Sequence, residues 1–216
     1  SYPTAELQAH VGEIRAVLEA EAAVPRKVRA RLEPLLCALE TEDLLDLQAA
    51  YCELFDQSRA LSLHLFEHVH GDSRERGQAM IDLGQQYVDR GFVMSAPELP
   101  DYLPLFLEFL SCLPPAEARE WLGQPVHVLT VLERRLAERG SGYAAVFQAL
   151  VVLSGVRPDP DDIARLQARI RTEAAKSVDQ EWEETPVDFS APAPETGSVF
   201  ARFRAARQAL SSAIKG

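Results

Sequence analysis

Apolar residues recur at steps of three and four along almost the whole chain, and no stretch alternates apolar and polar side chains. The three- to four-residue step is the period of an amphipathic helix, whereas a half-buried strand repeats every two residues. Proline and glycine residues divide the pattern into pieces of ordinary helix length. The sequence therefore predicts an all-α protein in which residues 1–176 form one globular helical bundle.

Local signals place the ends of the expected helices. Thr4 can cap a helix that runs to about Ala22, and Pro25 suits the first turn of the next helix, which Pro34 should kink or end. Further helices are expected over 41–69 with a break near Ser58, 72–90 with Asp72 or Ser73 as its cap, 101–113, 116–122, 126–139, 143–153 and 159–176.

The character of the chain changes after residue 176. Residues 177–198 are rich in acids, proline and small side chains, which predicts a flexible tether. Residues 199–216 (VFARFRAARQALSSAIKG) contain four basic residues and no acid, and their aromatic and aliphatic side chains follow a helical stripe. We expect a basic amphipathic helix there.

Charge and composition exclude several classes of protein. The formal net charge of −11 repels phosphate backbones, so nucleic acid is not expected as a partner, and a basic or apolar peptide is favoured instead. No apolar run approaches the roughly 20 residues that cross a bilayer, so no stable membrane insertion is expected. Three scattered cysteines and the lack of a signal segment at the start suit a cytoplasmic protein.

The pentapeptide HLFEH, from His64 to His68, fits the H-x-x-E-H pattern, in which two histidines hold zinc and the glutamate is the base. A catalytic zinc needs a third protein ligand, and the downstream glutamates of LERRLAERG read more simply as a solvated helix face. A helical projection of residues 51–70 leaves His64, Glu67 and His68 outside the apolar arc, on an exposed or groove-facing side. A metal-dependent hydrolase that uses these three residues is the alternative function.

Two further segments place polar residues next to apolar ones. Asp72, Arg74 and their neighbours crowd a turn between two expected helices, and ELPDYLPLFLEFL (98–110) combines three acids and two prolines with aliphatic and aromatic side chains. Core packing with helix caps explains such segments, and so does a groove for an amphipathic helix with a basic end. From the residues alone both interpretations stay open.

The same segments resemble a known family. DLLDLQAAYCELFDQSRALSLHLFEHVHGDSRERGQAM (43–80), with its Y-x-x-L-F element, and ELPDYLPLFLEFL, with an E-x-P-D-[YH] element, are similar to the NarJ-type (delta subunit) assembly chaperones of respiratory nitrate reductase, a branch of the redox-enzyme maturation chaperones that includes the TorD type. EWEETPVDF (181–189) resembles the tail of that family. The resemblance extends from about Tyr2 to Phe189.

The resemblance implies an all-α chaperone without catalysis or a cofactor of its own. Such chaperones bind the N-terminal segment of the nitrate reductase catalytic (alpha) subunit, which resembles a remnant twin-arginine signal, and hold the apoenzyme in the cytoplasm for insertion of the molybdenum cofactor before membrane docking. The matching positions are the candidate peptide-binding residues, some of which can equally be core: Tyr51, Phe55, Asp56, Arg59, Phe66, Glu67, His70, Asp72, Arg74, Glu98, Asp101, Tyr102 and Glu108.

Two features depart from the family pattern. Members usually carry a further apolar helix ahead of the position of Tyr2, so we expect that helix either to be missing here or to be trimmed from the fold. The basic segment 199–216 has no match in the family's own ending. It either occupies the acidic groove as a tethered mimic of the client peptide or is an accessory helix or loose tail.

Overall fold

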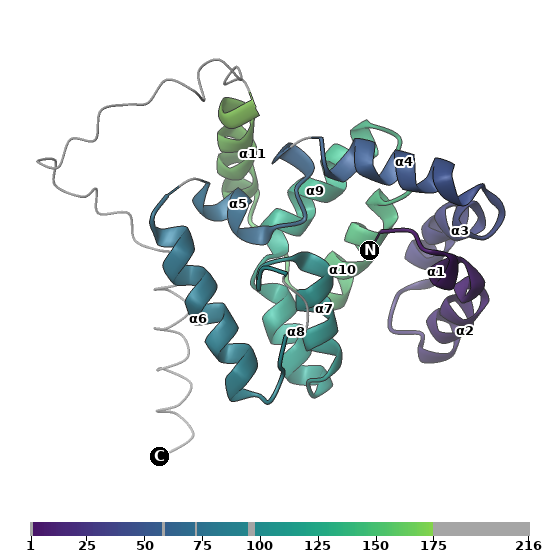
Figure 1. The fold of residues 1–216 in the computed structure, drawn as a ribbon, viewed down its shortest axis with the longest axis horizontal. Coiled ribbons are helices and arrows are strands. Elements are labelled where there is room, and N and C mark those ends of the chain that lie inside the picture. Colours follow the sequence, from purple (N-terminus) through teal and green to yellow (C-terminus); the bar gives the residue numbers. More distant parts are fainter. Residues whose placement is uncertain (1, 58, 72, 95–97, 175–216) are drawn as a thin grey trace, which may run out of the picture. The chain divides into compact units, whose positions relative to one another are not determined.

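A computed structural model describes residues 2–57, 59–71, 73–94 and 98–174, and in these ranges the chain is mostly helical (Figure 1). The helices are α1 (Ala5–Ala9), α2 (Val11–Glu21), α3 (Arg26–Thr41), α4 (Leu44–Phe55), the 3-10 turn η1 (Arg59–Leu61), α5 (Leu65–His70), α6 (Glu75–Asp89), α7 (Leu103–Ser111), α8 (Pro115–Gly123), α9 (Val126–Glu138), α10 (Ala144–Ser154) and α11 (Pro160–Ala174). Within these residues no strand forms, and the prediction of an all-α fold is confirmed. The tether and terminal helix predicted over 177–216 lie outside the described residues.

Helix α9 lies at the centre of the packing. Seven of its thirteen residues are buried, and it contacts α5, α10, α11 and η1. One apolar cluster joins α9 to η1 and α11 through Ala60, Val131, Ile163 and Ile170. The long apolar stripe of α9 therefore organises the helices that come before and after it in the sequence.

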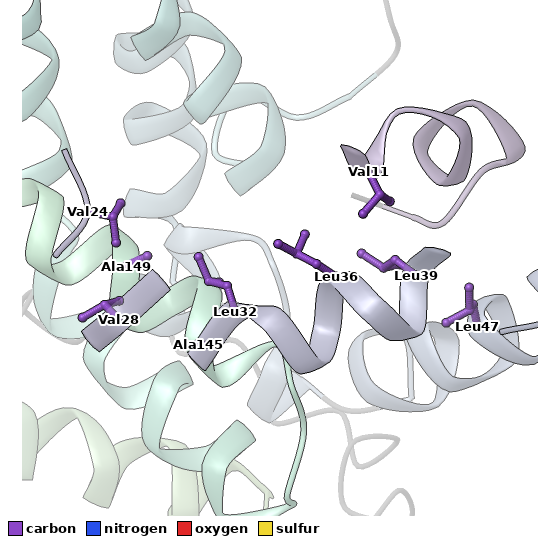
Figure 2. Packing of buried hydrophobic residues seen from close by; sticks show 9 residues of the cluster. All are labelled: Val11, Val24, Val28, Leu32, Leu36, Leu39, Leu47, Ala145 and Ala149. Atoms are coloured by element: carbon purple, nitrogen blue, oxygen red, sulfur yellow. The ribbon is translucent and has the colours of Figure 1, made fainter. Parts of the chain in front are cut away.

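A second cluster surrounds α3. Leu32, Leu36 and Leu39 lie along one side of this helix and meet side chains of α2, α4 and α10 (Figure 2). Pro34 was predicted to kink or end the helix, and it does not end it, because α3 continues through Pro34 to Thr41. Burial of the leucines on both sides of Pro34 stabilises the helix by more than the lost hydrogen bond costs.

Other predicted boundaries were partly right. The Thr4 side chain accepts a hydrogen bond from Leu7 N at 3.1 Å and caps α1, but the first predicted helix is divided at His10. Gly91 follows α6 with a φ of +77°, a conformation that glycine adopts without strain. The predicted cap at Ser73 is wrong, because the residue before α6 is Arg74 and it makes no side-chain cap bond.

Aromatic rings join α6 to α7 and α8. Tyr87 lies 4.4 Å from Phe109, centroid to centroid, and Phe109 lies 5.2 Å from Trp121. The Arg90 guanidinium stacks over Trp121 at 4.9 Å and also pairs with Glu117. None of the described helices is both long and apolar enough to cross a membrane.

Candidate peptide-binding site

Two segments that are far apart in the sequence pair side by side at the start of α5 and α7. Leu103 N donates to Leu63 O at 2.8 Å, and Leu65 N donates to Asp101 O at 3.0 Å. His64 and Tyr102 thereby form an isolated antiparallel bridge, and their rings lie 5.3 Å apart. We call these two paired segments, 62–66 and 98–103, the latch. The latch joins the two motifs on which the family resemblance rests.

The Asp101 carboxyl group holds the latch from inside. Asp101 is completely buried, and its Oδ2 accepts a hydrogen bond from Phe66 N at 2.9 Å. Since His64, the residue before α5, makes no side-chain cap bond, Asp101 supplies the cap of α5 from another segment. Its Oδ1 lies 3.3 Å from His64 Nδ1, and this hydrogen bond raises the pKa of His64 against the opposing effect of burial.

A cluster of four aromatic rings, which we call the aromatic floor, lies beside the latch and consists of Tyr2, Tyr51, Phe55 and Tyr143. Tyr51 on α4 is in ring contact with Tyr2, Phe55 and Tyr143, with centroids 4.7–5.9 Å apart. The Oη atom of Tyr51 is buried and has no partner at hydrogen-bond geometry within the described part of the chain. Burial, and to a smaller extent the neighbouring phenol of Tyr102, raises the pKa of Tyr51. Tyr51 and Tyr102 therefore bring α4 and the latch together.

The four predicted acidic side chains other than Asp101 that the structure describes differ in exposure and in place. Asp56 is exposed at the end of α4, close enough to Tyr51 to add to the rise in its pKa. Glu98 is exposed just before the latch aspartate, and Glu108 is exposed on α7. Glu67 is half-buried and pairs with Arg76 at 3.3 Å. Asp56 is thus the exposed acid next to Tyr51, and Glu98 is the exposed acid three positions before Asp101 in the sequence.

The remaining predicted residues fall into two groups. Phe66 and His70 are buried on α5 with rings 5.5 Å apart, and burial lowers the pKa of His70. Arg59 and Arg74 are exposed at the ends of loops. Asp72 lies outside the described residues. The structure thus brings Tyr51, Phe55, Asp56, Asp101 and Tyr102 into one region and leaves Glu108 and Arg74 on other elements.

The H-x-x-E-H motif does not form the helical pair that its spacing predicts. His64 has an extended backbone and precedes α5, because it pairs with Tyr102 in the latch. His68 is 2% exposed, and its Nε2 donates to Ser62 O at 2.8 Å, so its predicted place on an exposed or groove-facing side is wrong. Among the described residues no group of three or more His, Cys, Asp and Glu side chains could hold a metal ion. The hydrolase alternative therefore gains no support from this region.

Three residues of the region were not among the predicted site residues, although Arg76 was noted as part of the polar cluster at the turn before α6. Tyr143 was taken only as the start of a helix after Gly142, but its ring lies 5.3 Å from Phe55. Tyr2 covers Tyr51 from the N-terminal segment, which Gln48 fixes by donating to Pro3 O at 2.9 Å. Arg76 neutralises Glu67. Only the aromatic character of Tyr2 and Tyr143 could have indicated them.

Comparison with known proteins defines the class. The family model described as nitrate reductase delta subunit matches residues 21–149, which include α3, α4, the latch and most of α10. The chain belongs to this family, as the resemblance in its sequence predicted.

Individual relatives agree with that assignment. The chain is 44% identical over 191 residues to the nitrate reductase molybdenum cofactor assembly chaperone NarJ of Escherichia coli K12, which is 88% of this chain and 81% of the relative. It is 44% identical over 147 residues to the probable assembly chaperone NarW of the same organism, covering 68% of this chain and 64% of that protein. A probable NarJ of Bacillus subtilis is 30% identical over 154 residues, or 70% of this chain and 81% of the relative.

Proposed function

We propose that this protein is a cytoplasmic assembly chaperone, without catalysis of its own, for a respiratory nitrate reductase. It binds the N-terminal segment of the apo catalytic subunit and holds that subunit for molybdenum cofactor insertion before membrane docking. The observation that carries the proposal is the latch, in which the buried Asp101 carboxyl group of one family motif bonds His64 of the other, 37 positions earlier in the chain. The names of the relatives support the same function.

The proposed mode of recognition is an amphipathic helix on an aromatic surface. Tyr102 is half-buried beside His64, so part of its side chain remains accessible to a ligand. Apolar anchors of the client contact this surface, while Asp56 and Glu98 attract its basic residues. Tyr51, Phe55 and Phe66 are buried, so they shape the surface from below. Asp101 acts as a positioning residue, because its carboxyl group binds the chain's own N–H groups.

The test is calorimetric titration of the full chain with a synthetic peptide of the client's N-terminal segment. Tyr102→Ala removes the half-buried ring, and we expect at least a tenfold loss of affinity, or about 1.4 kcal/mol. Glu98→Gln removes an exposed charge, and a loss of about threefold at low salt should shrink as salt is added.

Glu21→Gln is the matched control, because Glu21 is also exposed but lies at the end of α2. Its affinity should equal that of the unmodified chain. If folded Tyr102→Ala and Glu98→Gln bind the peptide as well as Glu21→Gln does, the client does not use the latch and the proposed site is wrong.

A further inference from the structure

Helix α6 exposes an apolar row to solvent. Gly77, Ile81, Gly84 and Val88 follow one another at steps of four, three and four, so they lie on one face of the helix. Ile81 is 66% exposed and Val88 is 56% exposed. The neighbouring face of the helix, with Leu83 and Tyr87, is buried against the protein. The helix is thus apolar on its inner side and again on part of its outer side.

The loop after α6 adds to this row. A Cβ at Gly84 would lie 3.5 Å from Pro100 Cγ, so the returning loop passes along the helix at this point. Val93 is 78% exposed and Leu99, next to Pro100, is 45% exposed. Four of the nine large hydrophobic side chains exposed in the described part of the chain are therefore on α6 and this loop. Such concentration of apolar surface is typical of an interaction site.

An acidic row runs along the same helix. Glu75, Asp82 and Asp89 recur at seven-residue steps, and they lie on the far side of Ile81 from Gly84. Gln78 and Gln85 lie between the two rows and donate to Asp82 and Asp89 at 2.9 and 2.8 Å. The outer face of α6 thus changes from apolar, through amide, to acidic around the helix axis.

We propose that the outer face of α6 is a docking surface for a partner helix with an apolar stripe and Lys or Arg along one edge. Apolar side chains of that helix contact Ile81 and Val88. Gly77 has no side chain, and no described atom from another element lies within 4 Å of the position of a Cβ there, so the two backbones can approach closely at this point. The basic edge lies against the acidic row. This surface adjoins the latch where Pro100 lies against Gly84, but its proposed contact residues, Gly77, Ile81 and Val88, are not part of the latch.

The charges favour this occupant over two others. A second copy of the same face would bring carboxyl groups to the acidic row, and like charges repel. An anionic lipid surface would be repelled by the same acids. Only a helix with a basic edge satisfies both the apolar and the acidic row.

The experiment measures fluorescence anisotropy of a labelled designed helix of about 18 residues with a leucine stripe and lysines along one edge. Gly77→Arg fills the open position with a bulky cation, and it should weaken binding to the full chain at least tenfold. Gly12→Arg is the matched control, because Gly12 also lies in the first turn of a helix with nothing within 4 Å of its Cβ. It should bind within twofold of the unmodified chain.

A second pair of measurements is independent of the glycines. Ile81→Ser should also reduce binding about tenfold, whereas Val17→Ser, at another exposed apolar position, should not. A probe with glutamates in place of the lysines should bind at least tenfold more weakly. Equal binding by Gly77→Arg and Gly12→Arg, equal binding of the two probes, or salt-insensitive self-association through this face would each overturn the proposal.

The client peptide separates this surface from the latch. Gly77→Arg should bind the client's N-terminal peptide with unchanged affinity, while Tyr102→Ala should bind the designed helix with unchanged affinity. If both variants lose both ligands, there is one surface and not two, and the inference of a second docking surface fails even if the proposed function holds.

Discussion

The latch buries a polar group, whereas the outer face of α6 exposes apolar side chains. The two regions are neighbours, since Pro100 of the latch lies against Gly84 of α6. The latch buries the Asp101 carboxyl group completely, whereas α6 exposes two-thirds of Ile81. The buried carboxyl group has partners inside the protein in Phe66 N and His64 Nδ1. Among the described residues no helix covers Ile81. A buried polar group that has hydrogen-bond partners stabilises the fold, whereas an exposed row of apolar side chains can bind another molecule.

The strongest test of this contrast is Asp101→Ala, which leaves the buried Phe66 N–H without its acceptor. We expect the free energy of unfolding to fall by about 3 kcal/mol, because a buried group that loses a charged or polar partner is costly. Chemical denaturation followed by circular dichroism measures this. The exposed neighbour Glu98→Gln is the control and should change the free energy by less than about 0.5 kcal/mol. Equal effects of the two substitutions would mean that the latch does not depend on Asp101.

The second test concerns His64 in the latch and His70 at the end of α5, whose pKa values shift in opposite directions. The hydrogen bond to Asp101 raises the pKa of His64 above 6.5 in the folded state. Its stabilisation is therefore full below about pH 6.5 and is lost as the pH rises through the folded value. Burial lowers the pKa of His70, so its contribution is present above about pH 6.5 and is lost as the pH falls through the folded value.

Stability measured between pH 5 and pH 8 for His64→Gln and His70→Gln checks these signs. His64→Gln should lose more stability at pH 5.5 than at pH 8, whereas His70→Gln should make stability less sensitive to acid. If both substitutions change the pH profile in the same direction, the opposite surroundings assigned to the two rings are wrong.

The smallest expected effect is on α6 itself. Ile81→Ser and Val88→Ser together should change the free energy of unfolding by less than about 1 kcal/mol, because both side chains are already largely in water. Leu83→Ala on the buried side of the same helix should cost about 2–4 kcal/mol. Thermal and urea denaturation compare the two. A large loss for the serine variant would show that the outer face is part of the fold and not a docking surface.

Much of the fold followed from short-range signals. The cap at Thr4, the helix end before Gly91 and the starts of α8 and α11 at Pro115 and Pro160 were all predicted within one or two residues. The break at His10 was not predicted, because it has no distinctive local pattern. The continuation of α3 was not predicted either, because Pro34 is a local stop signal that the burial of leucines on both sides of it overrides. The apolar row of α6 was also missed, since its residues look like ordinary helix formers until their exposure is known.

The sequence by itself determined the all-α class and the family, because helical period, helix stops and long motifs depend on residues close together in the chain. Tertiary structure alone decided what each side chain does. Asp101, predicted as an acid that contacts the client, is an internal cap. His64 and His68, predicted as one face of a helix, point to different partners because Tyr102 draws His64 into the latch. Burial and hydrogen bonding depend on residues brought together from distant segments, and a one-dimensional pattern contains no record of those distances.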